Sequence, residues 1–131
     1  MKQVILLTTL FTVLVTGATA QKYYTKNGSI SFFSKTSMEN IKADNNQVLS
    51  VLNAQTGEIQ FSVLIKSFHF EKALMEEHFN ENYLESGKFP KATFKGTITD
   101  MSRVNFNTDG MYTVPVSGDL TIHGVTKKIT T

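Results

Sequence analysis

Residues 58–67 carry the most regular alternation of apolar and polar side chains in the chain, with Ile59, Phe61 and Val63 on one side. A period of two predicts a β-strand with one buried face. The preceding segment, 47–54, is also apolar and is separated from it by a short turn at Gly57. We therefore expect the two segments to form an antiparallel hairpin.

The second half of the chain repeats this pattern. Residues 93–99 and 111–123 both alternate, and a further strand is expected over 125–131 after a turn at Gly124. Pro115 cannot donate to a strand ladder, so it should lie at a sheet edge or a bulge. The pattern therefore predicts three more strands.

The residues that precede the first hairpin give weaker signals. Residues 21–28 are expected to form an extended lead-in, and 29–34 a short strand with Ile30 and Phe32 on one side. Residues 36–46 are polar and end in Asp-Asn-Asn, a composition typical of turns. We therefore predict a turn at residues 44–46.

One helix is predicted at about residues 70–85. Met75, Phe79 and Tyr83 recur every four residues, so they should share one face of this helix. Gly87 is expected to take the left-handed conformation that commonly ends a helix.

Antiparallel strands with one apolar face, together with a single helix, predict a mainly β fold. The expected architecture is a β-barrel or a strongly curled sheet, which is either closed or left open.

Residues 1–20 resemble a secretory signal peptide. Lys2 provides a positive charge, residues 4–15 are apolar, and Ala18-Thr19-Ala20 fits a cleavage site before Gln21. The apolar run is short for a membrane span, which needs about 20 residues. We therefore expect a periplasmic or secreted protein, cleaved after Ala20, with one domain over residues 21–131.

Composition narrows the function classes. The chain has 13 basic and 11 acidic residues, and one of the basic residues, Lys2, lies in the predicted leader. A balance this even gives no electrostatic basis for binding nucleic acid. The absence of cysteine excludes a disulfide framework and thiol catalysis.

No catalytic motif is visible, so we do not expect an enzyme and expect no cofactor. A metal-dependent enzyme that uses His69, His78 and His123 is a weak alternative, because their spacing matches no known metal motif. A solvated acidic helix face explains the carboxylates near His78. We expect His69 to point outward between two inward phenylalanines, and the ring of His123 to bond the backbone of its turn.

Three motifs carry a family resemblance. A histidine followed by an apolar residue occurs at 78–79, the segment FPKATF at 89–94, and the segment GDLTIHGVTK at 118–127. In this order they resemble the YceI-like family of secreted, lipocalin-like proteins, and the last motif is the most specific. The resemblance runs from about Ile30 to the end of the chain.

The resemblance implies a carrier that holds an isoprenoid or fatty acyl chain in an apolar cavity. The ten phenylalanines alone are better explained by a filled core, because small barrels pack their interiors with side chains. That reading gives the alternative function, a ligand-free β-domain that acts in protein interaction or envelope stress. Gly96 and Gly118 are expected to leave space on the inward faces, which favours a cavity.

The expected pocket is lined by the inward residues of the strands and the helix. They are Ile59, Phe61, Val63, Ile65, Phe68, Phe70, Met75, Phe79, Phe89, Phe94, Ile98, Val114, Leu120 and Ile122. Three residues near Pro90 are expected to contact a polar headgroup at the rim: His78, Lys88 and Lys91.

Family members continue beyond the position that matches Thr131, with strands that close the barrel. We therefore expect this chain to lack the C-terminal strands of the family. An open sheet would expose an edge strand, through which two copies could pair.

Overall fold

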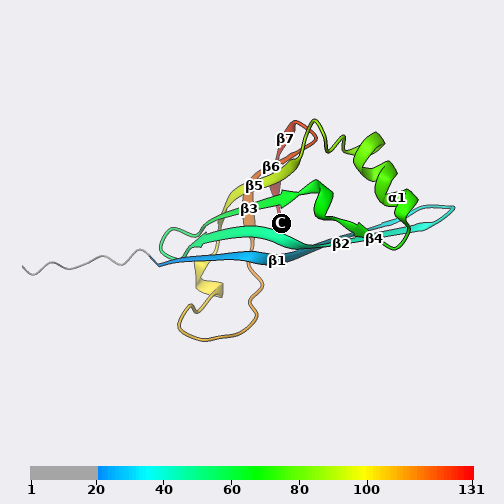
Figure 1. Cartoon of the computed structure of the whole chain (residues 1–131). Helices are drawn as coiled ribbons and strands as arrows, with labels where there is room; N and C mark the ends of the chain where they lie inside the picture. The colour runs from blue at the N-terminus through cyan, green and yellow to red at the C-terminus, as the bar shows by residue number, and fades with distance from the viewer. Residues whose placement is uncertain (1–20) are drawn as a thin grey trace, which may run out of the picture.

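The computed structural model describes residues 21–131, and the predicted signal peptide lies outside the described residues. Residues 21–131 fold into one curled antiparallel sheet with a single short α-helix beside it (Figure 1). The predicted fold class is confirmed.

The sheet has seven strands, most of which follow the order β1-β2-β3-β5-β6-β7. Their bounds are β1 Lys22–Lys35, β2 Asn40–Asn53, β3 Glu58–Leu64, β4 His69–Phe70, β5 Lys91–Ile98, β6 Val116–Ile122 and β7 Val125–Thr130. Strand β4 pairs with β2 outside this path. Within residues 21–131, β1 and β7 are the two edges and do not pair with each other, so the sheet is open.

Two tight hairpins follow the sequence prediction. Strands β2 and β3 pair from Leu52 opposite Ile59, and Gly57 between them has a left-handed φ of 76°. Strands β6 and β7 join through His123 and Gly124, whose φ angles are 52° and 70°. Two successive positive φ angles are typical of the turn that matches the twist of a two-residue hairpin.

Strand β1 is longer than predicted and includes the expected lead-in. It pairs with β2 from Lys22 opposite Asn53 to Lys35 opposite Asn40. The register shifts between Thr25 and Gly28, and again by Ile30. The second irregularity restores the original pairing offset, so the two shifts cancel along the ladder.

The prediction of a turn at residues 44–46 is wrong, because these residues lie inside β2. Asn45 is fully buried; its Nδ2 donates to the carbonyl of Leu64 (2.9 Å), and its Oδ1 accepts from the backbone N–H of Gln47 (2.9 Å). Its amide satisfies backbone groups beside the register shift, which a sequence pattern cannot reveal. The turn lies instead at Thr36–Glu39, where Thr36 N donates to the carbonyl of Glu39.

Two predicted strands are shorter in the structure. Strand β3 stops at Leu64 and passes into a 3₁₀ turn, η1 (Ile65–Ser67), which buries Ile65 and Phe68 on the same side. The strand predicted over residues 111–123 begins at Val116. Pro115 precedes it and has no N–H for the ladder; its carbonyl accepts bonds from the backbone N–H (3.0 Å) and the hydroxyl (3.4 Å) of Thr99.

The helical segment starts as α1 (Ala73–His78) and continues as a π-helical turn, η2 (Phe79–Tyr83). Leu84 N donates to the carbonyl of Phe79 (2.9 Å), five residues back. With this wider turn, Leu84 rather than Tyr83 lines the cavity together with Phe79. Tyr83 is therefore 68 % exposed, and the prediction that it shares the inward face is wrong.

The left-handed residue after the helix is Glu85, with φ 46°, and not Gly87 as predicted. Lys88 and Phe89 both donate backbone bonds to the carbonyl of Glu85, so the chain reverses at this residue before β5 begins. A 3₁₀ turn, η3 (Met101–Arg103), follows β5 and completes the elements.

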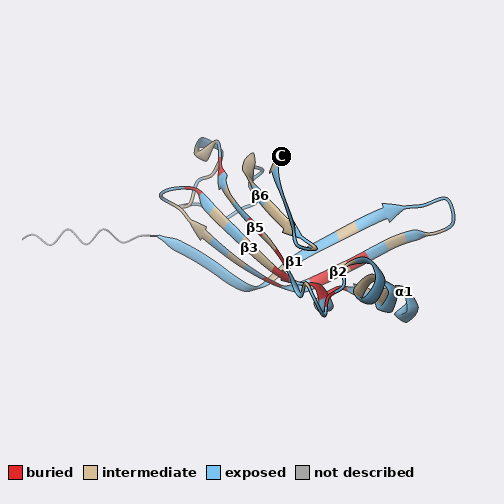
Figure 2. Cartoon of the chain, turned by 90° about the horizontal axis from the view of Figure 1, so that it is seen from above, coloured by how far each residue is buried: buried red, intermediate tan, exposed pale blue. Residues whose placement is uncertain are grey.

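The buried residues gather around the middle of β2 and the neighbouring ends of β3 and β5 (Figure 2). The central cluster consists of Ala43, Val48, Val63, Ile65, Phe68 and Ala92. Phenylalanines pack around it from several elements. The core therefore lies in the hollow of the curled sheet, on the side that faces the helical segment.

Candidate functional site

An apolar cavity of about 370 Å³ lies in this hollow. Strands β1, β3, β5 and β6 form its walls, and η1 and the helical segment contribute from one end. Ser31 and Thr93 are the only polar residues among its lining residues, and no charged residue lines it. The site therefore suits an uncharged apolar group.

The structure brings eight of the fourteen predicted pocket residues together around this cavity. They are Phe61, Val63, Ile65, Phe68, Phe79, Phe94, Leu120 and Ile122. Phe61 and Phe94 lie opposite each other on β3 and β5, and their rings stack at 5.9 Å. Contact of these residues with a ligand stays a prediction.

Three predicted pocket residues lie away from the cavity at the opposite end of the sheet. Ile59 pairs with Gly96 on β5, and Ile98 is buried next to the η3 turn. Val114 precedes β6 and lies outside the regular strand. Their alternation correctly indicated a buried side, but the cavity does not extend along the whole strand.

The other three predicted pocket residues do not line the cavity. Phe70 and Met75 line a smaller hollow between β2 and the start of α1. Phe89 packs under the β6–β7 turn, with its ring 4.8 Å from that of His123. A side chain at Gly124 would clash with the Phe89 ring, which explains the glycine at this position.

The prediction missed six lining residues: Ile30, Ser31, Phe32, Leu84, Ala92 and Thr93. The sequence pattern placed Ile30 and Phe32 on one side of a strand, and this signal could have identified them. Ala92 follows the inward alternation of β5 but is small. Leu84 depends on the π turn, which has no signal in the apolar spacing.

The two glycines expected to leave space do not enlarge the cavity. Gly96 and Gly118 face each other on β5 and β6. A Cβ at Gly118 would lie 2.4 Å from Gly96 Cα, and one at Gly96 would meet the ring of Phe94. They allow close approach of the backbones instead.

None of the three predicted headgroup residues lines the cavity. His78 is exposed, with its Nδ1 2.8 Å from the amide nitrogen of Asn82. The Nζ of Lys88 lies 5.2 Å from the centre of the Phe89 ring, and Lys91 is exposed at the start of β5. Their role at the rim stays a prediction.

The three histidines have different partners. His69 points outward as predicted, and its Nδ1 lies 3.6 Å from Glu76 Oε1. His123 Nε2 lies 2.9 Å from Glu85 Oε1, so its ring bonds a carboxylate and not the turn backbone, contrary to the prediction. Among residues 21–131, no three potential ligands are grouped to hold a metal ion. The arrangement gives the metal-enzyme hypothesis no support.

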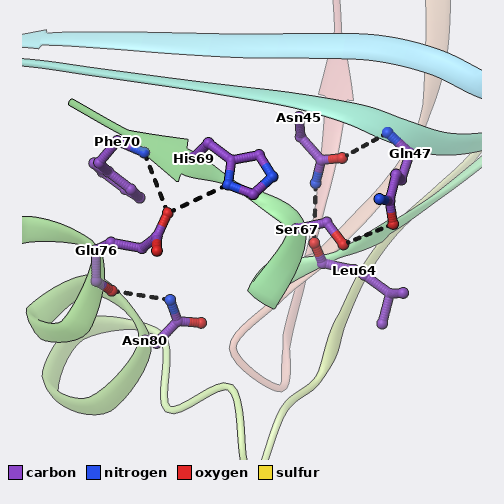
Figure 3. Close-up of polar contacts among 8 residues, drawn as sticks. All are labelled: Asn45, Gln47, Leu64, Ser67, His69, Phe70, Glu76 and Asn80. Atoms are coloured by element: carbon purple, nitrogen blue, oxygen red, sulfur yellow. Dashed lines mark hydrogen bonds and ion pairs between the residues drawn. The ribbon is translucent and has the colours of Figure 1, made fainter. Parts of the chain in front are cut away.

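Polar contacts hold the helical segment and the η1 turn against the sheet (Figure 3). Glu76 Oε1 accepts from the backbone N–H of Phe70 (3.3 Å), and Asn80 Nδ2 donates to the carbonyl of Glu76 (2.9 Å). At the η1 turn, Ser67 Oγ donates to Gln47 Oε1 on β2 (3.2 Å). These bonds attach the helical segment to β4 and the η1 turn to β2.

The described residues contain two shifted pKa values, and neither belongs to a cavity residue. The pKa of Lys72 is raised by its hydrogen bond and attraction to Glu39. The pKa of Asp100 is lowered, chiefly by its hydrogen bond with Ser102.

No helix in residues 21–131 has the length and apolar character that crossing a membrane requires.

Several known proteins are similar to this chain. The chain is 34% identical over 76 residues to a UPF0312 protein of Pseudomonas fluorescens, covering 57% of this chain and 37% of that protein. A polyisoprenoid binding domain from Saccharophagus degradans superposes with a TM-score of 0.67 at 20% identity, covering 86% of this chain and 65% of that chain. A YceI protein of Campylobacter jejuni gives a TM-score of 0.44 at 14% identity, covering 99% and 66%.

This chain thus spans little more than a third of the Pseudomonas protein and just under two thirds of the Saccharophagus domain. A family model described as YceI-like domain matches residues 12–131. This match includes nearly all of the chain, and the chain therefore belongs to the YceI-like family.

Proposed function

We propose that this chain is a periplasmic or secreted binding protein for an apolar lipid, of the polyisoprenoid or fatty acyl type. The observation that carries the proposal is the cavity of about 370 Å³, whose lining includes five phenylalanines and no charged residue. Its volume lies within the range of roughly 300–1,000 Å³ that is common for small-molecule sites. Membership of the YceI-like family and the likeness to a polyisoprenoid binding domain support the same ligand class.

Affinity would come from removing an apolar chain from water. Each buried methylene contributes about 0.8 kcal/mol, so a short chain already gains several kcal/mol. The absence of charged residues among the lining leaves no partner for a buried ionic group, whose desolvation would be costly. A polar headgroup would therefore stay at the rim, where His78, Lys88 and Lys91 are the proposed contacts.

The test uses the full chain produced with its leader in a bacterial host and analysed by native mass spectrometry. We expect a bound mass of several hundred daltons that organic extraction removes. Leu120→Trp should block the cavity from β6 and reduce the bound fraction. Asp119→Trp is the matched control, because its side chain is exposed on the same strand. An unliganded mass before and after incubation with farnesol and palmitic acid would refute the proposal.

Export is proposed from the leader sequence. We expect a periplasmic product that begins at Gln21, which N-terminal sequencing of the fractionated protein would check. A product that retains residues 1–20 in the cytoplasm would contradict this.

The open sheet supports a second candidate, an interaction module that binds another protein through a strand edge. Strands β1 and β7 are both edges in residues 21–131, and Val125 on β7 is 54 % exposed. Exposed edges favour pairing with another strand. Unliganded dimers in the same mass spectra would favour this candidate, whereas liganded monomers would favour the carrier.

A further inference from the structure

Four phenylalanine rings form a continuous wall at the helical end of the cavity, here called the aromatic partition: Phe32, Phe68, Phe70 and Phe79. Phe79 touches each of the others, with ring centres 5.5 Å from Phe32, 5.6 Å from Phe68 and 4.8 Å from Phe70. Phe32 also contacts Phe68 at 5.5 Å and Phe70 at 5.9 Å. Phe79 is therefore the centre of the partition.

The partition separates two spaces. Phe32, Phe68 and Phe79 line the main cavity. Phe70 lines a second hollow of about 160 Å³ between β2 and the start of α1, together with Met75. One layer of rings thus lies between the apolar cavity and a hollow that opens beside the helix.

The second hollow is chemically different from the cavity. Its lining includes Glu39, Lys42 and Lys72, and Lys72 forms an ion pair with Glu39. An apolar chain that passed the partition would meet first Met75 and Phe70 and then charged groups. The two spaces together would suit a longer ligand with a polar end at the helical side.

The backbone fixes the rings in this position. Phe32, Ala43 and Phe70 lie opposite one another across β1, β2 and β4. Ala43 is fully buried, and its small side chain lets the two flanking rings approach. Phe79 begins the π turn, and Glu76 in the turn before it bonds to the backbone of Phe70 (Figure 3). The partition is therefore held by both the sheet and the helix.

We propose that the aromatic partition sets the upper length of the apolar chain that the cavity accepts, and that Phe79 is its principal specificity-determining residue. This inference rests on the proposed lipid-binding function. While the ring of Phe79 is present, the chain must end at the partition. Loss of the ring joins the cavity to the second hollow and lets the chain continue past Phe70.

The experiment measures binding of unbranched 1-alkanols from eight to eighteen carbons by displacement of an environment-sensitive fluorophore. Native mass spectrometry confirms that one alkanol binds per chain. In the unaltered protein, affinity should rise by about fourfold per methylene and then stop rising at one chain length. That length is the cutoff set by the partition.

Phe79→Ala should move the cutoff to longer alkanols by two or more carbons and raise the affinity for the longest ones at least tenfold. Phe79→Leu keeps an apolar side chain and should move it less; it serves as the variant of choice if the alanine variant does not fold. Phe70→Ala opens the partition from the other side and should also lengthen the cutoff. Tyr83→Ala is the matched control, because this aromatic residue of the same π turn is 68 % exposed.

An unchanged cutoff in folded Phe79 and Phe70 variants that still bind alkanols would overturn the partition and leave the proposed function intact. Failure of the unaltered protein to bind any alkanol or farnesol would overturn the proposed function, and this inference with it. A longer cutoff in Tyr83→Ala as well would also overturn the partition, since it would indicate general loosening.

Discussion

His123 and Glu85 are paired by their side chains, with 2.9 Å between Nε2 and Oε1, and both have left-handed backbone conformations. They are the two non-glycine residues with positive φ in residues 21–131, at 52° and 46°. Each directly follows a cavity-lining residue, Ile122 and Leu84 respectively. The contact therefore joins the β6–β7 turn to the end of the helical segment beside the cavity.

The pair should contribute little energy, because both side chains are close to half exposed. Exposed pairs typically contribute about 0.2–1 kcal/mol. A double-mutant cycle with Glu85→Gln and His123→Asn, measured by urea unfolding, should give a coupling energy within that range. A coupling above about 2 kcal/mol would contradict this assignment.

The backbone of Glu85 gives a separate prediction. A left-handed conformation costs a non-glycine residue about 1–2 kcal/mol, and glycine avoids this cost. Glu85→Ala and Glu85→Gly both remove the carboxylate, but only glycine relieves the backbone. We expect Glu85→Gly to be more stable than Glu85→Ala by about 1 kcal/mol in urea unfolding, and equal stabilities would refute the strain.

Asn45 shows where sequence-based prediction failed. Its neighbours in Asp-Asn-Asn have the composition of a turn, yet its amide is buried and bonds to Leu64 and Gln47. Asn45→Ala would leave the Leu64 carbonyl without this donor, which typically costs about 1–3 kcal/mol. We expect that loss of unfolding free energy in Asn45→Ala. The exposed neighbour in Asn46→Ala should change stability by less than about 0.5 kcal/mol, and similar effects at both positions would contradict this account.

The alternation of apolar and polar residues correctly predicted the features of the fold that depend on local sequence. The alternation in β3 and β5 identified Phe61, Val63 and Phe94 as inward residues, and the turn at Gly57 identified the β2–β3 hairpin. These signals are strong because a strand that is buried on one face repeats every two residues.

The features that the sequence pattern did not predict depend on tertiary structure. With the π turn, Leu84 and not Tyr83 lines the cavity beside Phe79, although the four-residue spacing favours Tyr83. Alternation also cannot show where along a strand the cavity ends: Ile59 and Ile98 continue the pattern but are not among the residues that line it. Sequence therefore identified the buried face but not the length of the cavity.

The close approach of the backbones at Gly96 and Gly118 gives a further prediction. A Cβ at Gly118 would lie 2.4 Å from both the Gly96 Cα and the Lys95 carbonyl oxygen, and neither backbone atom can move aside easily. Gly118→Ala should therefore destabilise the protein by roughly 1–3 kcal/mol, as overpacking does. Gly87→Ala is the matched control: its Cβ would have no neighbour within 4 Å and its φ is not positive. The control should be neutral or stabilising by up to about 1 kcal/mol in thermal and urea unfolding, and a harmless Gly118→Ala would disprove the close approach.

Asp100 makes stability depend on pH in the acid range. Its carboxylate accepts from the backbone N–H of Ser102 (3.2 Å) and from the Ser102 hydroxyl, and lies 3.3 Å from Arg103 Nε. The hydrogen bond with Ser102 is the main cause that lowers the pKa of Asp100 below its ordinary value of 3.8. A lowered pKa in the folded state means that folding favours the ionised form, so this stabilisation is present above pH 3.8 and is lost as the pH falls through the lowered pKa.

We therefore expect Asp100→Asn to be less stable than the unaltered protein at pH 6, with the difference shrinking steadily as the pH falls below 3.8. Urea unfolding at a series of pH values measures this difference directly. Asp109→Asn, in the exposed loop that follows, is the matched control for replacing an exposed aspartate by asparagine. A difference for Asp100→Asn that stays constant down to pH 2 would show that its carboxylate contributes through shape and not through charge, because only the ionised form is favoured by these donors.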